Sequence, residues 1–235
     1  MDNEALIELD GVDVHREEGS ERLLGAVNWR IGRGEFWAVS GLPGSGKSSL
    51  LLTAAGLNRP GAGTLRVFGR DLAQATEEEQ VDWRRRIGFV YEHGGRLFSH
   101  LSVYENLALP LLYHTEADEA ECLPRVEQAL HRAELTGCAL LKPSRVSVRQ
   151  QRRASLMRAL IVTTEALFLD SPLSGLGARD ARWWTDYLRE LKTQGLTIVV
   201  GDDEYRPWLG LADHFGLIEG EQFRVITEAA AREWN

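Results

Sequence analysis

Several residue types that mark special classes of protein are scarce or missing from this sequence. Only two cysteines are present, Cys122 and Cys138, and their spacing matches no metal-binding or redox motif, which fits a reducing compartment. No apolar run approaches the roughly 18 residues that a membrane-spanning helix requires, and the acidic first five residues carry no signal-peptide pattern. The formal net charge of −8 argues against a general nucleic-acid binder, so we expect no nucleic-acid partner.

The residues that are present describe a soluble globular chain. Hydrophobic residues make up 43% and charged residues 26% of the 235 positions, which is the balance of an ordinary folded domain. This length can bury one good core, or one core with a subdomain attached. We therefore expect a single domain over residues 1–235.

One stretch carries a specific chemical signal. Residues 41–48, Gly-Leu-Pro-Gly-Ser-Gly-Lys-Ser, match G-x-x-x-x-G-K-[ST], the phosphate-binding loop. A short apolar run precedes the motif at 36–39 and a helix-competent run follows it at 50–55, which is the strand–turn–helix context that the motif needs. The alternative, a glycine-rich turn with a surface lysine, leaves that context unexplained. The predicted nucleotide-binding residues are Gly41, Gly44, Ser45, Gly46, Lys47, Ser48 and Ser49.

These residue types suit a nucleoside triphosphate and Mg²⁺. The three glycines let backbone N–H groups and the N-terminus of the following helix point at phosphate oxygens. Lys47 is expected to reach the β- and γ-phosphates, and the Ser48 hydroxyl is expected to ligate Mg²⁺. The motif predicts a binding site but does not say how the binding is used.

The rest of the chain alternates between strand and helix patterns. Period-two alternation predicts strands at 6–14 and 24–31, and further strands are predicted at 63–68, 87–91, 166–170 and 196–200. Thr76 and Glu79 form a capping box that starts a helix ending near Arg85. Another helix is predicted at 179–192, a hairpin at 214–226 and a last short helix at 227–233. This alternation around a phosphate loop implies a mainly parallel α/β sheet, with the site at the carboxyl ends of its strands.

Residues 92–160 differ in character from the segments on either side. They show helical patterns and loops, with Thr115 as the expected N-cap of a helix that extends to Leu135. We interpret them as a helical subdomain inserted between two strands of the core. Residues 1–91 and 161–235 then form the core together with a β subdomain.

An apolar strand that ends in Asp170 suggests a family. A strand-end aspartate by itself often only starts a loop, but residues 166–176 resemble the Walker B strand and D-loop of ATP-binding cassette (ABC) ATPases. In the same order along the chain, residues 87–91, 150–160 and 212–220 resemble the strand before the family's Q-loop, the helix after its signature and its closing hairpin. The resemblance implies a P-loop NTPase of the ABC ATPase type, with a mainly parallel core sheet, an antiparallel β subdomain and an inserted helical subdomain.

The chain departs from the family pattern where the family acts on its nucleotide. The aromatic residue that stacks on adenine corresponds here to Glu18. Glu92 replaces the Q-loop glutamine, Ser171 the catalytic glutamate, and Asp202 the switch histidine. Gly177 stands at the D-loop aspartate, and the signature Leu-Ser-Gly-Gly-Gln becomes Val-Ser-Val-Arg-Gln at 146–150, without its glycines.

The retained Lys47, Ser48 and Asp170 predict Mg-ATP binding, and the replacements predict weak or absent hydrolysis. Ser171 cannot act as a general base near neutral pH without an activating partner, and loss of a base costs about 10²–10⁴ in rate. An ionised Asp202 repels the γ-phosphate instead of donating to it, and loss of one donor costs roughly 10²–10³. Ser48 and Asp170 are the expected Mg²⁺ ligands, and Glu92 is a further candidate.

The resemblance also implies partners and a location. ABC ATPases sandwich each nucleotide between one loop and the signature of a second ATPase chain, and they serve a transmembrane permease. We therefore expect a homodimer or heterodimer, peripheral on the cytoplasmic face of the inner membrane. Residues 92–114, with Phe98 and Tyr104, are predicted to dock on the permease, unless they belong to the core of the subdomain. The segment 97–111 is most similar to the ATPases of Mla/MCE-type phospholipid-trafficking transporters.

Two other functions stay open at this point. A pseudoATPase scaffold could steady a membrane complex while binding nucleotide as a regulatory ligand, or none. Independently of this choice, Ser147 and Gln150 could serve only as a helix-capping box. A P-loop small-molecule kinase is disfavoured by the signature-like helix, the closing hairpin and the lack of an arginine-rich lid.

Overall fold

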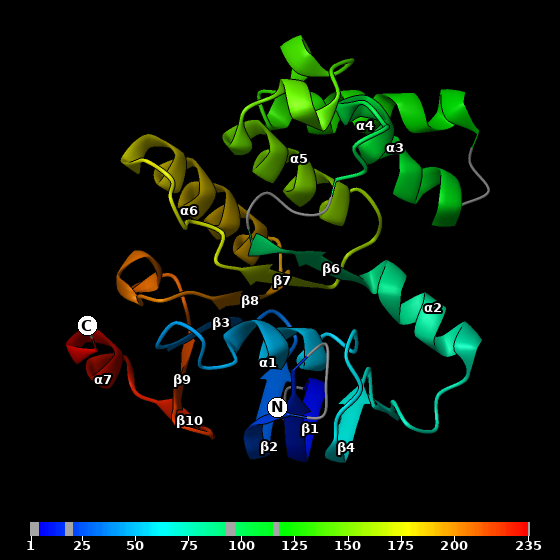
Figure 1. Cartoon of the computed structure of the whole chain (residues 1–235). Helices are drawn as coiled ribbons and strands as arrows, with labels where there is room; N and C mark the ends of the chain where they lie inside the picture. The colour runs from blue at the N-terminus through cyan, green and yellow to red at the C-terminus, as the bar shows by residue number, and fades with distance from the viewer. Residues whose placement is uncertain (1–4, 17–20, 93–96, 115–117, 235) are drawn as a thin grey trace.

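The computed structural model describes residues 5–16, 21–92, 97–114 and 118–234, and its elements are arranged in layers (Figure 1). The strands are β1 (Ala5–His15), β2 (Arg22–Gly32), β3 (Phe36–Gly41), β4 (Ala62–Val67), β5 (Arg70–Asp71), β6 (Ile87–Val90), β7 (Ala166–Asp170), β8 (Thr197–Gly201), β9 (His214–Glu219) and β10 (Gln222–Ile226). The helices are α1 (Lys47–Ala54), α2 (Glu77–Arg86), α3 (Val103–His114), α4 (Glu119–Arg132), α5 (Val148–Leu160), α6 (Ala178–Thr193) and α7 (Glu228–Glu233).

The central layer is a six-stranded sheet in the order β10-β9-β3-β8-β7-β6. All neighbouring pairs are parallel except the β9–β10 hairpin, which confirms the predicted mainly parallel sheet. Every residue of β3, β7 and β8 is buried, as expected for parallel strands covered on both faces. Successive side chains alternate between the faces, so Phe36 joins the core beneath α5 and α6 while Trp37 joins the core around α1.

A second, four-stranded sheet with the order β2-β1-β4-β5 covers the α1 side. Its pairs are antiparallel, which is the predicted antiparallel β layer. Helix α1 lies between the two sheets (Figure 1) and packs against strands of both. Its leucines Leu50 and Leu51 are fully buried there, so the start of α1, and with it the phosphate-loop motif, is fixed by packing on both sides.

Helices α3, α4 and α5 pack together beside the edge strand β6 (Figure 1). The capping boxes predicted at Thr76 and Ser147 are both present and start α2 and α5. The prediction for α4 is wrong at its start: the N-cap is Asp118, which forms a capping box with Glu121. Thr115 lies outside the described residues. None of the described helices is long and apolar enough to span a bilayer.

Candidate functional site

A cavity of about 260 Å³ lies at the loop between β3 and α1. Four other segments lie beside this loop: the β1–β2 hairpin and the segments that follow β6, β7 and β8. Strands β3, β8 and β7 are neighbours in the sheet (Figure 1), so the cavity lies at the carboxyl ends of parallel strands, as predicted. Its lining consists of Arg16, Leu23, Pro43, Gly44, Gly46, Lys47, Ser48, Ser49, Glu92, Ser171 and Asp203.

The loop requires glycine at the predicted positions. Gly44 and Gly46 have φ angles of 79° and 97°, in the region that side chains rarely adopt. At Gly41 a Cβ would lie 2.6 Å from the Ile218 carbonyl oxygen, so a side chain would collide with the β9 backbone. Gly46 is the N-cap of α1. The free N–H groups at this helix start therefore face the cavity, as an anion site requires.

Lys47 brings a buried positive charge to the cavity, since its side chain is only 7% exposed. Its ammonium group donates to the carbonyl oxygens of Gly41 and Leu42, at 2.7 and 3.1 Å. It also forms an ion pair with the Asp203 carboxylate at 2.9 Å. A phosphate that binds Lys47 must therefore compete with a carboxylate that belongs to the protein.

Asp170 and Ser48 have the features of a magnesium site. Their side chains are hydrogen-bonded to each other, and the Oδ1 atom of Asp170 is buried without a hydrogen-bond partner among the described residues. Burial raises the pKa of Asp170, against the Ser48 hydrogen bond, and the nearby charge of Glu92 raises it further. A divalent cation would satisfy this orphaned oxygen and offset the charge. One carboxylate and one hydroxyl are a sufficient protein contribution when phosphates supply other ligands, so the residues fit Mg²⁺.

The two acids that follow β8, Asp202 and Asp203, take different positions. Asp202 is half-buried, and its carboxylate accepts from the Trp208 indole at 3.3 Å and from the Asp203 backbone N–H at 2.9 Å. Burial raises the pKa of Asp202 to about 6. Asp203, which the sequence analysis did not single out, lines the cavity instead and contacts Lys47. The acid that opposes a bound phosphate most directly is therefore Asp203.

Ser171 lines the cavity directly after Asp170, as the sequence predicted. Its backbone has a φ angle of 45°, a left-handed conformation that costs an L-residue roughly 1–2 kcal/mol. The Ser171 N–H donates to the Gly201 carbonyl oxygen at 2.8 Å, which ties the end of β7 to the end of β8. The turn therefore presents a hydroxyl group to the cavity, and this group is a poor base.

Two further side chains extend the site. Glu92 shares the cavity with Ser48 and Ser171, and its charge also acts on the buried Arg152 guanidinium. Glu18, predicted to stand at the base-stacking position, lies outside the described residues. Arg16, which sequence reasoning missed, also lines the cavity. The available signal was its place directly after β1, where the hairpin turns back.

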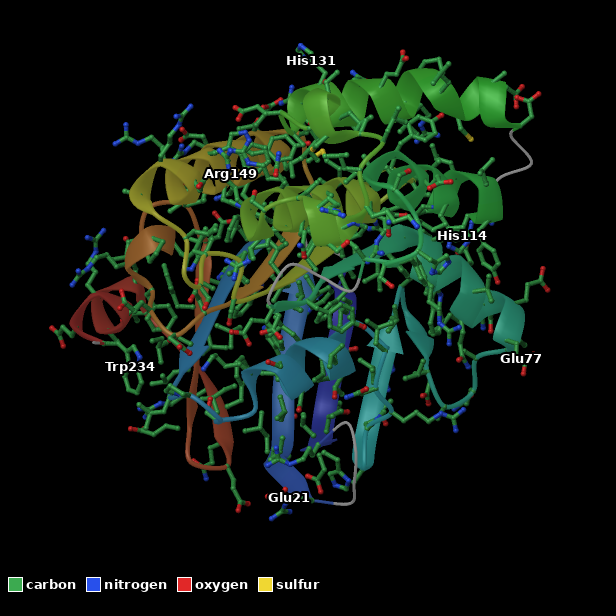
Figure 2. All side chains as sticks on the ribbon, turned by 45° about the horizontal axis from the view of Figure 1, so that its top comes forward. Glu21, Glu77, His114, His131, Arg149 and Trp234 are labelled. Atoms are coloured by element: carbon green, nitrogen blue, oxygen red, sulfur yellow. The ribbon has the colours of Figure 1, made fainter. Side chains whose placement is uncertain are left out.

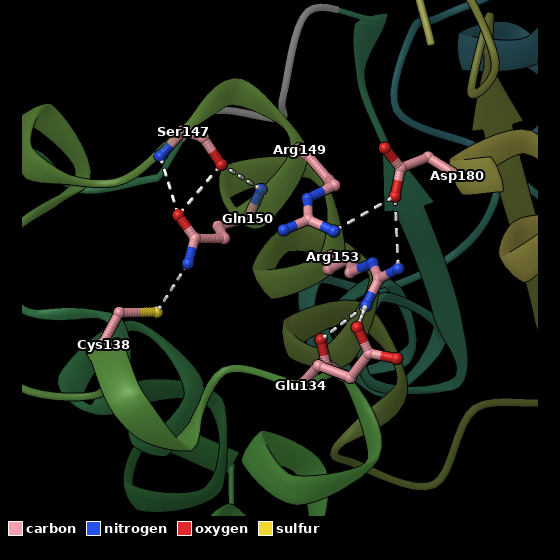
Figure 3. Close-up of polar contacts among 8 residues, drawn as sticks. Glu134, Cys138, Ser147, Arg149, Gln150, Arg153 and Asp180 are labelled. Carbon is pink, nitrogen blue, oxygen red and sulfur yellow. Dashed lines mark hydrogen bonds and ion pairs between the residues drawn. The ribbon is translucent and has the colours of Figure 1, made fainter. Parts of the chain in front are cut away.

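The signature-like residues 146–150 are absent from the described lining of this cavity. Ser147 caps α5 by accepting from the Gln150 backbone N–H at 3.3 Å, and the Gln150 side chain accepts from the Ser147 N–H at 2.9 Å (Figure 3). The other end of the Gln150 amide donates to the Cys138 sulfur at 3.5 Å. Val148 is 56% exposed, so the helix presents a branched side chain where the family pattern has glycine.

Arg149 belongs to a small charge network at the same helix start (Figure 3). Its guanidinium lies 3.5 Å from the Asp180 carboxylate, which also pairs with Arg153 at 3.3 Å. Arg153 is almost fully buried and reaches Glu134 at 2.7 Å. Figure 2 shows Arg149 on the opposite side of the molecule from Glu21 in the β1–β2 hairpin. A nucleotide held at Lys47 is therefore not expected to touch the signature residues of its own chain.

Comparison with known families and curated proteins agrees with the resemblance to ABC ATPases. Residues 24–174 match the family described as ABC transporter. The chain is 35% identical over 200 residues to the macrolide export ATP-binding/permease protein MacB 1 of Aeromonas hydrophila, covering 84% of this chain and 31% of that protein. It is 32% identical over 218 residues to the methionine import ATP-binding protein MetN of Rhizobium etli, covering 92% and 59%. The chain thus spans less than two thirds of the length of either relative.

Solved structures share the fold over nearly the whole chain. The dimeric structure of a post-hydrolysis state of the ATP-binding cassette MJ0796 bound to ADP and Pi superposes with a TM-score of 0.84 at 27% identity, covering 94% of this chain and 99% of that one. The structure of cbiO1 from Clostridium perfringens gives a TM-score of 0.79 at 23% identity, covering 95% and 87%, and supports the fold alone.

Proposed function

This chain belongs to the ABC transporter family, as an ATP-binding domain, and from that premise we propose that it binds Mg-ATP in the cavity at Lys47 but hydrolyses it slowly or not at all. Its fold is the P-loop NTPase fold of ABC ATPases, as the sequence resemblance predicted. An intact phosphate loop is combined with Ser171 and Asp203 at the cavity wall, and this combination carries the proposal.

Binding is supported by the loop and by the metal pair. The loop backbone and the start of α1 offer N–H groups to the phosphates, and Lys47 offers a buried positive charge. Ser48 and Asp170 would hold Mg²⁺, which would supply charge neutralisation between the phosphate oxygens. The unpartnered Oδ1 of Asp170 is the protein atom that gains most from that ion, because a buried polar atom without a partner is costly.

Slow turnover is supported by the residues around the position of the attacking water. Ser171 stands where the family carries glutamate, and a serine hydroxyl does not accept a proton near neutral pH. The Asp202 carboxylate is turned toward Trp208, and Asp203 brings negative charge to the cavity. Glu92 is the other carboxylate of the described cavity lining, so it is the residue to test if turnover is found.

A regulatory scaffold is the second candidate function, and one observation favours it. The ion pair between Lys47 and Asp203 already satisfies the loop cation, which should weaken nucleotide binding. A chain of this kind would stabilise a complex and would bind nucleotide only at high nucleotide concentration. The two functions differ in whether complex formation requires Lys47.

We extend the proposal to partners and location by relation to the family. MJ0796 is dimeric with ADP and Pi, and we propose that this chain also pairs with a second ABC ATPase chain. We propose further that it serves a permease and lies peripherally at the cytoplasmic face of the membrane. Phe98 at 46% exposure and Tyr113 at 77% leave apolar surface on the segment predicted to dock. The printed cargoes of the relatives, a macrolide and methionine, belong to those proteins, and a phospholipid cargo remains a prediction.

The docking surface can be tested by crosslinking from Ser99, which is exposed. Ser102 is unsuitable because its hydroxyl is buried and caps α3 by accepting from the Glu105 N–H at 3.2 Å. In the assembled complex we expect adducts with the membrane subunit from position 99. Their absence, with good crosslinker incorporation, would count against docking at this segment.

The binding claim is tested by calorimetric titration of Mg-ATP into wild type, Lys47→Ala and a matched control, Lys142→Ala. Lys142 is exposed and lies outside the cavity lining, so its loss should change nothing. We expect binding by wild type and by the control, and its loss in Lys47→Ala. Equal heats for all three proteins would defeat the claim.

A further inference from the structure

A groove away from the phosphate loop lies between α4, α5 and α6, which sit on the same side of the core sheet (Figure 1). Its cavity has a volume of about 310 Å³. Each of its two walls repeats at positions i, i+3, i+4 and i+7, the spacing of one face of a helix, and extends about 10 Å at a rise of 1.5 Å per residue. The α4 wall consists of Arg125, Gln128, Ala129 and Arg132, and the α6 wall of Tyr187, Glu190, Leu191 and Gln194.

The floor of the groove is apolar. It is formed by the end of α5, through Met157, Leu160 and Ile161, and a methionine side chain adapts readily to the shape of an apolar ligand. A second cavity, of about 480 Å³, adjoins the first, because four residues line both: Leu160, Tyr187, Leu191 and Gln194. The second cavity adds Val162 and Leu196, so the apolar floor continues beyond the two walls.

Contacts between the three helices fix the shape of the groove. Arg132 pairs with Glu190, which ties α4 to α6, and its guanidinium lies 5.0 Å from the centre of the Tyr187 ring. Arg125 donates to the Ile161 carbonyl oxygen at 2.7 Å, which ties α4 to the C-terminus of α5. The groove is therefore formed before any ligand enters it, as is usual for small-molecule sites of 300–1,000 Å³.

Arg125 brings a positive charge to the groove that the described lining does not balance. The charged side chains of the described lining of the first cavity are Arg125, Arg132 and Glu190, and Glu190 is already paired with Arg132. A guanidinium has five N–H donors, and the described contacts of Arg125 use one of them. A carboxylate matches such donors in charge and in shape, so the groove is suited to an anion with an apolar body.

We propose that the groove binds an acyl carboxylate, with its carboxylate on Arg125 and its chain along the apolar floor. Burial of the chain is favourable in proportion to the apolar area removed from water. This site is separate from the nucleotide cavity, since the described linings have no residue in common. The second cavity includes Thr197 at the start of β8, whereas the nucleotide cavity lies at the opposite ends of the core strands. Binding of the carboxylate should therefore not require Lys47.

The test separates a carboxylate site from a purely structural role of Arg125, which also caps the C-terminus of α5. Octanoate, octanamide and butyrate are titrated, below micelle-forming concentrations, into wild type and four variants. Octanamide keeps the chain without the charge, and butyrate keeps the charge with a shorter chain. The variants are Arg125→Gln, Gln128→Trp, Arg182→Gln and Lys47→Ala, and melting curves confirm that each is folded.

Two of these variants are matched to the groove. Gln128 is exposed and lines the α4 wall, so a tryptophan there fills the groove with little effect on the core. Arg182→Gln is the control for Arg125→Gln, because Arg182 is an exposed arginine of α6 outside both described linings. Lys47→Ala tests whether the groove is independent of the nucleotide cavity.

We expect wild type to bind octanoate about fivefold more tightly than octanamide, the upper range for an exposed ion pair, and more tightly than butyrate. Arg125→Gln should bind octanoate about fivefold more weakly than wild type does and should no longer distinguish it from octanamide. Gln128→Trp should bind neither, and Arg182→Gln and Lys47→Ala should match wild type.

An equal loss of octanoate and octanamide in Arg125→Gln would overturn the proposed site, because Arg125 would then act only as a helix cap. Unchanged octanoate affinity in Arg125→Gln or in Gln128→Trp would overturn it by placing the ligand elsewhere. A wild type that binds no octanoate would overturn it as well.

Discussion

The ion pair between Lys47 and Asp203 makes a prediction that runs against the usual effect of mutating a binding site. Asp203 competes with phosphate for the loop lysine and adds negative charge where a polyanion must bind. Removing its charge should therefore strengthen nucleotide binding. Asp203→Asn is the appropriate change because the contacts of the Asp203 backbone, its carbonyl with the Ser40 hydroxyl at 2.9 Å and its N–H with Asp202, do not use the side chain.

The size of the effect follows from the exposure of the two partners. Lys47 is 7% exposed, but Asp203 is 57% exposed, so water screens the pair and its contribution lies near the upper end of the range for surface pairs, ~1 kcal/mol. Relief of this competition corresponds to about a fivefold lower Kd for Mg-ATP. The gain should shrink as salt is added, because exposed charges are screened within about 10 Å at 0.1 M ionic strength.

The assay is a Mg-ATP titration of wild type, Asp203→Asn and Glu204→Gln at low and high salt. Glu204 is the next acid along the chain, is exposed and does not line the cavity, so it controls for a general change of charge. Weaker binding of Mg-ATP by Asp203→Asn than by wild type would contradict this prediction, since Asp203 would then assist the metal or its water. The prediction would also be refuted if Glu204→Gln gave the same gain.

Two further predictions concern Ser171 and Asp202. Ser171→Glu alone should recover little hydrolysis. Ser171→Glu combined with Asp202→His, given a competent partner chain, should raise turnover by more than the product of the two single effects, because such groups act as a unit on one transition state. Independent effects of the two substitutions in a steady-state ATPase assay would contradict this. Asp202 should also lower stability as pH rises. Its pKa is raised from 3.8 to about 6, so the folded state binds more protons between these values, and raising the pH through this window should cost up to about 3 kcal/mol from this group. Urea unfolding of wild type and Asp202→Asn at pH 4 and pH 7 measures the difference, and an identical pH dependence in both proteins would rule the effect out.

Much of the fold could be predicted because its signals are local. The strands of the core sheet are short apolar runs, and the capping boxes at Thr76 and Ser147 each involve two residues three positions apart. The loop glycines could be predicted because a phosphate loop allows few alternatives at those positions. The start of α4 was misjudged because Thr115 and Asp118 are both good N-caps in sequence, and only the capping box with Glu121 distinguishes them.

The site could be predicted less completely because its wall is assembled from distant segments. Sequence spacing predicts a role for Asp202, but it does not indicate that the Trp208 indole binds that carboxylate or that Asp203 pairs with Lys47. Arg16 is brought to the loop by the pairing of β1 with β2, and no local pattern around it indicates a binding residue. Which of two neighbouring residues at the end of a strand faces the cavity depends on such tertiary contacts.

The rate of phosphate release from Mg-ATP by the purified chain, measured beside its own Lys47→Ala variant, tests directly whether this site hydrolyses ATP. We expect wild type to bind Mg-ATP in a parallel titration and yet to release phosphate no faster than the variant. Turnover of wild type at ordinary ATPase rates of ~1 s⁻¹ or more, lost in Lys47→Ala, would contradict it. Glu92→Gln would then be the first variant to assay, since that carboxylate shares the cavity with Ser48 and Ser171.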